Sequence, residues 1–526
     1  MMFQFEFLAS LLLVIFPLFF FFLKTSSFTQ LRKIKKSSSS SSSQITTTTK
    51  FPKSYPLLGQ SIAISANQER FNQWATQLLQ DSPNGNILLH RPLGHLQLVT
   101  TNPANVQHIL KNEFNLYPKG DFFRDTLTNF LGDGIFNADG DNWRFQRQIS
   151  SHEFNTKSLR KFIETVVEDE VFDRLLPLLS EAASNNYVLD LQDILQRFTF
   201  DNVCKIAFGY DPACLSSSFP QPRSEFAEAF EAATQLSSER FHYIFPPLWK
   251  LKRALDIGSE KRLREANATV REFATKVVRE KRRELEEKKS SLETQDLLSR
   301  ILNSGHSDER FATDMVISFI LAGRDTTSAA LIWFFLLVSR NPRVEEELMK
   351  ELKEKPESLD YDHVKHVVYT HAAICETMRL YPPVPNDTKF AAADNVLPDG
   401  TFVKKGAGVT YFPYAMGRME KIWGKDCMEF RPERWLEKEE TETQNSPSAG
   451  KLKFVGKDPY TYPVFQGGPR ICLGKDMAFL QMQRIVAGVM QKYRVVPAEK
   501  EFDPLFVSYL SSKMKGGFPV RIEERK

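Results

Sequence analysis

Ten residues near the carboxyl end constrain this chain more than any other segment. They run from Phe465 to Gly474, read FQGGPRICLG, and lead into a stretch of helical character that ends near Tyr493. The run Gly467-Gly468-Pro469 favours a tight loop, so Cys472 is expected at the mouth of the following helix. Free N–H groups and partial positive charge at a helix N-terminus stabilise a thiolate. The segment therefore predicts a sulfur that is held and tuned as a thiolate.

The cysteine pattern of the chain gives Cys472 no disulfide or zinc role. The chain has five, which are Cys204, Cys214, Cys375, Cys427 and Cys472. Their number is odd, their spacings are wide and they form no C-x-x-C pair, so neither a disulfide framework nor a zinc site is indicated. A reducing compartment fits this usage best.

Two neighbours of Cys472 fit a flat prosthetic group. Gly474 has no side chain, so a macrocycle could approach the backbone closely there, and Arg470 could pair with a propionate. The pattern F-x-x-G-x-R-x-C-x-G, which includes Phe465, resembles the haem-binding loop of the cytochrome P450 monooxygenases. That resemblance implies haem b with Cys472 as the axial thiolate ligand of the iron. Such a ligand pushes electron density onto iron and favours O–O cleavage.

Further motifs occur in the order that this family requires. Glu376 and Arg379 lie three residues apart, on one face of a helix, and resemble the family's E-x-x-R motif. Arg434, in the segment Phe430 to Trp435, resembles the third partner. The resemblance implies a buried Glu–Arg–Arg cluster that locks the haem-proximal side.

Two motif positions and one lysine are expected at the haem edge. Trp143 and Arg147 resemble the family's W-x-x-x-R and, at i and i+4, share a helix face from which both could reach a propionate. Lys389 is expected to contact the haem from the far side. The resemblance therefore predicts a haem edge formed by these three side chains together with Arg470.

The longest apolar stretch of the body runs from Phe311 to Arg340. Thirty residues would form a helix of about 45 Å. Arg324 and Asp325 interrupt the apolar run, which argues against a second membrane span. One long helix inside the folded body is the prediction.

This helix contains Ala322-Gly323-Arg324-Asp325-Thr326-Thr327, which resembles the family's A-G-x-D-T-T motif. Gly323 would leave room for O₂ above the iron. Thr326 can hydrogen-bond its preceding turn and loosen the helix locally, while Asp325 would relay protons from solvent. Asp325 and Thr326 are therefore the predicted catalytic residues.

The first fifty residues predict a membrane anchor and a tether. No charged residue occurs from Phe7 to Leu23, and basic residues follow directly, so residues 1–24 predict a transmembrane signal anchor with the body in the cytosol. A cleaved signal peptide is the alternative, but no basic segment precedes the apolar run and no small-residue cleavage site follows. Residues 25–50, basic and then rich in serine and threonine, predict a flexible tether. The expected location is the endoplasmic reticulum membrane, with a single pass.

The remaining residues, 51–526, contain no interior linker and are predicted to form a single large domain. Most of this domain is helical in pattern, including an amphipathic helix over Gly258 to Glu287. Short strand-like segments are Ile87 to Leu89, Leu96 to Val99, Gly408 to Tyr411 and Pro519 to Ile522. The predicted fold class is mainly α with small β-sheets (α+β), and the resemblance implies the cytochrome P450 fold.

Several segments around these motifs are similar to the plant fatty-acid omega-hydroxylases of the superfamily. They include Gly134 to Gly140, Ile149 to Asn155 and Tyr411 to Arg418. The resemblance implies a fatty acid, hydroxylated at or near its terminal carbon. Hydroxylation of jasmonoyl-isoleucine, as in close relatives, is the alternative. By family position, the expected substrate-binding residues are Phe122, Phe123, Leu127, Phe130, Ile135, Phe319, Ala322, Val384 and Leu510.

Two classes of function remain as remoter alternatives, and one class is excluded. A haem-thiolate enzyme that rearranges hydroperoxides without O₂, and a non-enzymatic haem sensor, have no use for the Asp325–Thr326 pair. Lys and Arg number 69 against 65 Asp and Glu, a net charge of +4, which does not indicate a nucleic-acid partner. The expected partners are O₂, membrane lipid and an NADPH-cytochrome reductase, since the chain has no nucleotide-binding glycine motif of its own.

Overall fold

The computed structural model describes residues 51–154, 156–215, 222–287, 296–304, 308–355, 361–364, 366–438 and 452–525. Helices dominate this part of the chain and include α2 Ser61–Ala66, α3 Phe71–Gln80, α4 Pro103–Gln107, α5 Gly120–Leu131, α6 Gly140–Ser151, α7 Thr156–Lys161, α8 Leu176–Asn185, α9 Leu191–Phe208, α10 Glu225–Glu239, α11 Pro247–Ala254, α12 Gly258–Glu287, α13 Leu297–Asn303, α14 Glu309–Ile320, α15 Thr326–Arg340, α16 Pro342–Lys353, α17 Tyr361–Val364, α18 Val368–Leu380, α19 Pro413–Met416, α20 Glu420–Trp423 and α21 Lys475–Lys492. Short 3₁₀ or π segments include η7 Glu170–Leu175, η8 Arg240–His242, η9 Leu321–Asp325, η10 Pro432–Trp435, η11 Pro463–Phe465 and η12 Gly468–Arg470.

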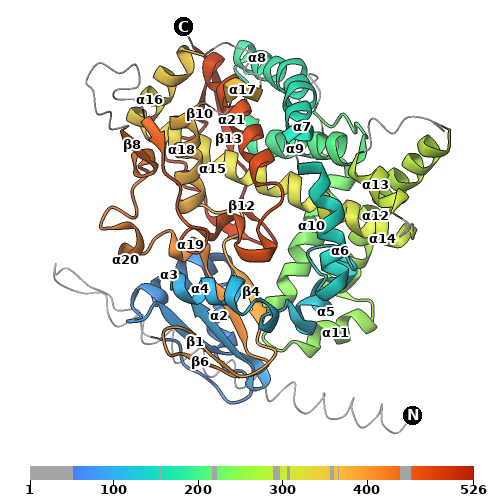
Figure 1. The fold of residues 1–526 in the computed structure, drawn as a ribbon, viewed down its shortest axis with the longest axis vertical. Helices are drawn as coiled ribbons and strands as arrows, with labels where there is room; N and C mark the ends of the chain where they lie inside the picture. Colours follow the sequence, from blue (N-terminus) through green and yellow to red (C-terminus); the bar gives the residue numbers. More distant parts are fainter. Residues whose placement is uncertain are drawn as a thin grey trace. The chain divides into compact units, whose positions relative to one another are not determined.

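The strands form one four-stranded sheet and several smaller ones. They are β1 Asn86–His90, β2 Leu96–Thr100, β3 Leu189–Asp190, β4 Asp387–Phe390, β5 Asn395–Val396, β6 Phe402–Val403, β7 Gly408–Tyr411, β8 Leu436–Lys438, β9 Leu452–Phe454, β10 Tyr493–Pro497, β11 Phe506–Ser508, β12 Ser512–Met514 and β13 Pro519–Glu524. The largest sheet has the order β1-β2-β7-β4, in which β2 and β7 pair in parallel and the other neighbours pair antiparallel. It therefore joins the N-terminal part of the domain to a segment three hundred residues further along (Figure 1). The prediction of a mainly α protein with small sheets is confirmed.

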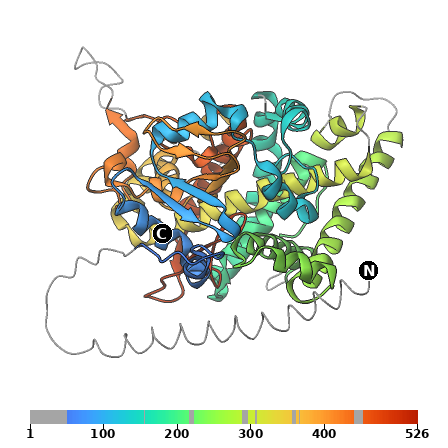
Figure 2. The same ribbon diagram turned by 90° about the horizontal axis from the view of Figure 1, so that it is seen from below.

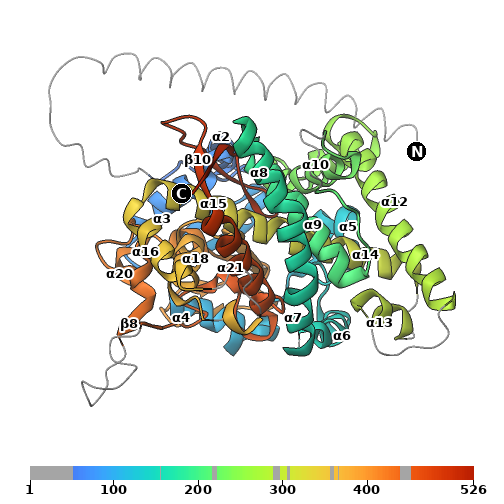
Figure 3. The ribbon, with the colours of Figure 1, turned by 90° about the horizontal axis from the view of Figure 1, so that it is seen from above.

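The predicted elements lie where the sequence indicated them. The amphipathic helix is α12, with the expected bounds, and the four strand-like segments fall within β1, β2, β7 and β13. The helix after the cysteine loop is α21, which packs beside α18 (Figure 3).

The long apolar helix is the centre of the domain. It comprises α14, η9 and α15, and every residue from Thr327 to Val338 is buried. Figure 2 shows it, in yellow, passing between the other helices. Among the described residues, only this helix, Glu309–Arg340, is long and apolar enough to cross a membrane. Since 78% of its most apolar window is buried inside the protein, it is a core helix.

The predicted anchor, residues 1–24, and tether, residues 25–50, lie outside the described residues. Lys50–Lys526 form a compact unit by their internal contacts.

Candidate active site

The cysteine loop has the tight geometry that its glycines predicted. Gly468 has φ +62°, and a Cβ there would fall 1.9 Å from the Leu110 carbonyl oxygen, so only glycine fits. The loop closes through the Cys472 N–H, which donates to the Phe465 carbonyl at 2.9 Å. Helix α21 begins at Lys475, so the sulfur lies just before the helix N-terminus.

Cys472 stands apart from the other cysteines by its exposure. Its side chain faces a cavity, whereas Cys204, Cys375 and Cys427 are buried and Cys214 is partly buried; none of the five is in a disulfide. Surrounding protein raises the pKa of the Cys472 thiol, and the Gly474 N–H and the Arg147 charge act in the opposite direction. Coordination to a metal deprotonates a thiol outright, so this sulfur is available as an iron ligand.

The cavity in front of the sulfur, called here the sulfur cavity, has a volume of about 300 Å³. It is bounded by the cysteine loop on one side and by η9 and α15 on the other, through Ala322, Gly323 and Thr326. A Cβ added to Gly474, which lines this cavity, would lie 3.5 Å from the Phe154 ring and 4.0 Å from the Cys472 sulfur. The missing side chain therefore leaves room beside the sulfur for a flat macrocycle.

One edge of the sulfur cavity is cationic, which fits the propionates of haem. Trp143, Arg147, Arg470 and Lys119 all line it. Arg470 stacks on the Trp143 ring, 4.4 Å from its centroid, and donates to Asp139 at 2.7 Å. Arg147 forms no ion pair among the described residues and is half-buried, so burial lowers the pKa of its guanidinium. An uncompensated cation at this position suits a carboxylate ligand.

Lys389 lies elsewhere than predicted. It is buried and does not line the sulfur cavity, because its ammonium is 2.5 Å from the Asp387 carboxylate. Lys119, at the start of α5, reaches the same carboxylate at 2.9 Å and does line the cavity. Burial raises the pKa of Asp387, but the two ammonium groups outweigh it and hold that pKa well below its usual range. The structure thus offers Lys119 as the lysine at the haem edge.

Glu376, Arg379 and Arg434 come together as the sequence predicted. Arg379 donates to both Glu376 oxygens at 2.8 Å, and Arg434 Nε donates to one of them at 3.2 Å. The Trp435 indole N–H adds a fourth hydrogen bond, at 2.9 Å. The Glu376 and Arg379 side chains are both fully buried.

This cluster supports the cysteine loop from behind. Helix α18, which carries Glu376 and Arg379, packs on α21, and Tyr462 at the start of the loop donates to the Cys375 carbonyl at 2.9 Å. The cluster therefore ties α18 and η10 together next to the loop that holds Cys472.

The helix above the sulfur is locally widened at its motif. Residues Leu321–Asp325 form a π-type turn, η9, and the Thr326 hydroxyl donates to the Ala322 carbonyl at 2.7 Å. Such turns are frequent at functional sites. The expected loosening of the helix by Thr326 is thus present in the structure.

Gly323 and Asp325 differ from expectation in what they contact. A Cβ on Gly323 would fall 2.5 Å from Val203 of α9, so this glycine allows close helix packing. Asp325 is buried and lines neither cavity described here; it accepts from Arg324 at 2.7 Å and from the Ser511 hydroxyl at 3.3 Å. Ser511 lines the apolar cavity and thereby connects Asp325 with its wall.

A second cavity of about 520 Å³, called here the apolar cavity, adjoins the first. The two share the wall residues Lys119, Phe136, Ala322, Thr326, Val384, Asp387 and Gln466. Of the predicted substrate-binding residues, the apolar cavity is lined by Phe122, Phe123, Leu127, Ala322, Val384 and Leu510, and the sulfur cavity by Ile135, Phe319, Ala322 and Val384.

Phe130 is the exception among the predicted wall residues. It is 1% exposed and lines neither cavity. Its ring packs instead against Phe230 of α10, at a centroid distance of 5.3 Å. Leu131 and Phe136 also line the apolar cavity. Helical periodicity places Phe130 on the same face as Phe123, but it carries no information on which neighbour fills that face.

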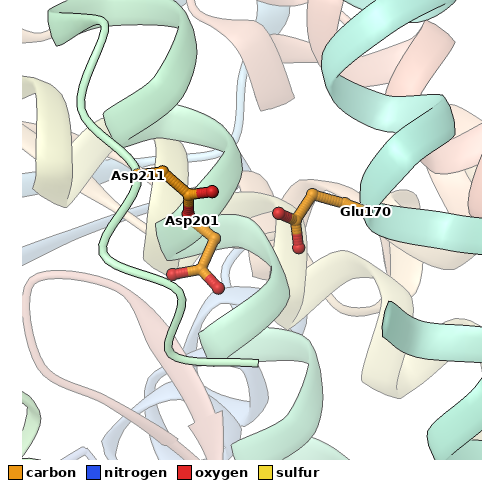
Figure 4. A group of neighbouring side chains, drawn as sticks. All are labelled: Glu170, Asp201 and Asp211. Atoms are coloured by element: carbon orange, nitrogen blue, oxygen red, sulfur yellow. The ribbon is translucent and has the colours of Figure 1, made fainter. Parts of the chain in front are cut away.

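Three carboxylates away from both cavities form a separate cluster. Glu170 of η7 reaches toward Asp201 and Asp211 (Figure 4). Their charges are already met, since Arg174 contacts Glu170 and Asp211 at 2.6 Å and Lys205 contacts Glu170 at 2.7 Å. The arrangement is an ion-pair network that joins η7 to α9 and to the segment after it.

Comparison with known proteins agrees with this site. The family model described as Cytochrome P450 matches residues 50–514. Cytochrome P450 94A1 of Vicia sativa is 59% identical over 475 residues, which cover 90% of each chain. Cytochrome P450 94A2 of the same plant is 58% identical over 480 residues, covering 91% of this chain and 92% of that protein. Cytochrome P450 94B1 of Arabidopsis thaliana is 46% identical over 479 residues, covering 90% and 91%.

These relatives and the cysteine loop lead to one assignment. A match over nearly the whole chain brings with it the prosthetic group of the family, which is haem with a cysteine thiolate as axial ligand. The chain therefore belongs to the cytochrome P450 family of monooxygenases, among its plant members of the 94 group.

Proposed function

We propose that this protein hydroxylates fatty acids at or near the terminal carbon, with O₂ and electrons from an NADPH-cytochrome reductase. The observation that carries the proposal is the adjacency of the two cavities. Phe136, Ala322 and Val384 line both of them, so the apolar cavity lies next to the space in front of Cys472. A long alkyl chain can lie along such a wall with one end near the sulfur.

The side chains around the cavities suit a flexible apolar substrate. Phe122 and Phe123 of α5 pack on Phe241 of η8, with centroid distances of 6.0 and 5.6 Å, and all three line the apolar cavity. Burial of each methylene of an alkyl chain contributes about 0.8 kcal/mol. The binding of a saturated chain therefore becomes stronger with each methylene that it buries. Its terminal carbon is the part that can reach the shared wall.

Haem bound in the sulfur cavity would supply O₂ activation, with Cys472 as the iron ligand and Arg147, Arg470 and Lys119 as propionate partners. The chain's own contribution is to deliver protons. The Thr326 hydroxyl stands on the wall shared by both cavities. Asp325 reaches the apolar cavity through its hydrogen bond from Ser511, and it would pass protons along that route.

Replacement of Thr326 by alanine should separate electron consumption from hydroxylation. The hydroxyl that holds a proton source at the shared wall would be lost, and general acid catalysis of this kind is worth about 10²–10⁴-fold. Since water can partly substitute, we expect hydroxylated product per NADPH to fall about tenfold or more. Product and NADPH are measured in the same assay. Thr326→Ser keeps the hydroxyl and should retain most of the coupling; equal coupling in Thr326→Ala and the parent would contradict the role.

Electrons are expected to enter on the face that carries the thiolate loop. Lys475, at the start of α21, and Arg144 of α6 are exposed and could dock an acidic reductase surface, although Arg144 already pairs with Asp141 at 2.7 Å. For Lys475→Glu combined with Arg144→Glu, we expect reductase-supported turnover to fall about tenfold at low ionic strength. Reduction by dithionite serves as the control and should be unchanged. Turnover equal to that of the parent would remove these residues from the docking surface.

The proposed location is the endoplasmic reticulum membrane, with one pass near the N-terminus and the catalytic domain in the cytosol. The basic residues from Lys24 to Lys36, directly after the apolar run, support this orientation. Protease treatment of sealed microsomes should then degrade the catalytic domain from outside. Protection of the domain would reverse the topology.

The substrate is tested in microsomes that contain the protein, a plant reductase and NADPH. Lauric acid, oleic acid and jasmonoyl-isoleucine are offered side by side, and products are identified by mass spectrometry. Terminally hydroxylated fatty acids as the main products would support the proposal. Jasmonoyl-isoleucine is a candidate because it also has an alkyl end remote from a carboxylate. Turnover of this conjugate alone would favour the alternative function, its hydroxylation. Product formed without the reductase would point to a hydroperoxide-rearranging enzyme, and carbon monoxide binding without any turnover to a haem sensor.

A further inference from the structure

One guanidinium on the wall of the apolar cavity has no acidic partner. Arg91 directly follows β1, is partly buried, and donates one hydrogen bond, from Nη2 to the Phe241 carbonyl at 2.6 Å. No carboxylate in the described part of the chain forms an ion pair with it. A guanidinium has five N–H donors, so most of the hydrogen-bonding capacity of Arg91 is unused by the protein.

The surroundings of Arg91 do not neutralise its charge. Burial lowers its pKa to about 10, which leaves it cationic at neutral pH. Nearby His242 has a pKa lowered to about 4, first by burial and then by the Arg91 charge, so it is neutral. A cation in a partly desolvated site without a counter-charge is costly, and a bound anion would offset that cost.

The other charged groups on this wall are already accounted for. Lys119 is held by Asp387 at 2.9 Å. Asp121 and His95 are exposed, and solvent screens them. Among the described residues that line the apolar cavity, Arg91 is therefore the cation best placed to receive an anion.

We propose that Arg91 binds the carboxylate of the substrate on the part of the apolar cavity wall where it contacts Phe241 of η8. The proposal rests on the function proposed above, since it concerns the same cavity. Arg91 contacts Phe241, the Phe241 ring packs on Phe123, and the wall of the same cavity includes Ala322 and Thr326. An acid held at Arg91 would lay its chain along these rings and present its far end at the shared wall. Arg91 would thus select carboxylic acids over neutral lipids and determine which carbon is hydroxylated.

The Phe241 carbonyl prepares Arg91 for this task. Its hydrogen bond fixes the guanidinium on a residue whose own ring lines the cavity and contacts Phe122 and Phe123. The η8 segment therefore contacts both the Arg91 guanidinium and the phenylalanine rings of the apolar wall. A planar guanidinium can also donate hydrogen bonds to both oxygens of a carboxylate, which lysine cannot do with the same geometry.

The test compares each acid with its methyl ester. Ferric holoprotein is titrated with lauric acid and methyl laurate, and with jasmonoyl-isoleucine and its methyl ester, and the change in the haem absorption spectrum gives each Kd. The parent should bind at least one acid more tightly than its ester. Arg91→Met should raise the Kd of that acid about 10- to 100-fold, as expected for a charge-assisted hydrogen bond, and leave the ester within about twofold. Arg91→Lys should fall between them.

Arg264→Met is the matched control, because Arg264 is an exposed arginine paired only with surface acids; its Kd values should equal those of the parent. Equal affinity of acid and ester in the parent, or an equal loss for both in Arg91→Met, would overturn the inference. The parent comparison needs no variant and holds even if Arg91→Met fails to fold. Product analysis judges the proposed hydroxylation separately: fatty-acid products with acid and ester bound equally would leave that function standing and remove Arg91 from it.

A second readout concerns the position of hydroxylation. If Arg91 fixes the carboxyl end, its loss lets the chain slide along the cavity. Arg91→Met should then give a larger share of in-chain products from lauric acid than the parent and Arg264→Met give. An unchanged product distribution together with an unchanged Kd would assign Arg91 to tethering Phe241 alone.

Discussion

Replacement of Cys472 by serine should abolish the thiolate-type spectrum of the reduced, carbon monoxide-bound protein, and with it the hydroxylase activity. A serine hydroxyl is far less acidic than a thiol and cannot give iron the electron density that favours O–O cleavage. We therefore expect turnover to fall by at least about 10³-fold, the order of a lost covalent or electrostatic centre. The measurements are the carbon monoxide difference spectrum and product formation with reductase and NADPH.

The fold should survive this substitution, which makes the result interpretable. Cys472 faces the sulfur cavity and is not packed in the core, and its N–H bond to the Phe465 carbonyl involves only backbone. Cys214→Ser is the matched control. Cys214 is partly buried and lines neither the sulfur cavity nor the apolar cavity, so its loss should leave spectrum and activity intact. A thiolate-type spectrum that persists in Cys472→Ser would mean that another residue holds the iron.

Local spacing was enough to predict the parts of the site that lie close together in sequence. The glycines before Cys472 fix the loop whatever surrounds it, since Gly468 needs a positive φ that other residues disfavour. Glu376 and Arg379 share a helix face at any position in a fold. The apolar run from Phe311 to Arg340 predicts a long helix, which lies either in a membrane or in the core of the domain.

The residues that the sequence did not reveal depend on contacts between distant segments. Arg91 was singled out because no carboxylate in the described part of the chain forms an ion pair with it, and the element it contacts, η8, lies 150 residues later in the chain. The sequence predicts Phe130 in the pocket because the residues of α5 alone do not reveal that its ring packs against Phe230 of α10. Such pairings are set by tertiary packing.

Lys389 is an intermediate case, for which a signal existed. Residues two apart on a strand point to the same side, and Asp387 stands two residues before Lys389 on β4. A strand at these positions predicts an ion pair between Asp387 and Lys389, which leaves the Lys389 ammonium less available for a contact with haem. Lys119, by contrast, enters the same ion-pair group from 268 residues earlier in the chain, and no local pattern marks it.

The cluster behind the cysteine loop should dominate the stability of the domain. In Glu376→Gln the carboxylate that accepts hydrogen bonds from Arg379, Arg434 and Trp435 is lost, and Arg379 is left as a buried charge without a counter-ion. Removal of one partner from a buried ion pair costs about 3–5 kcal/mol. We expect the free energy of unfolding, measured by guanidinium denaturation of the holoprotein, to fall by about that amount, and haem to be lost at lower denaturant.

The chain offers a close control for this substitution. Glu433, which precedes Arg434 on η10, pairs with Arg343 at the surface, where the two side chains are 36% and 60% exposed. An exposed pair is worth about 0–1 kcal/mol, so Glu433→Gln should unfold almost as the parent does. If the two variants unfold at the same denaturant concentration, the buried cluster does not stabilise the loop, and the position of Cys472 must depend on the packing of α18 and α21 alone.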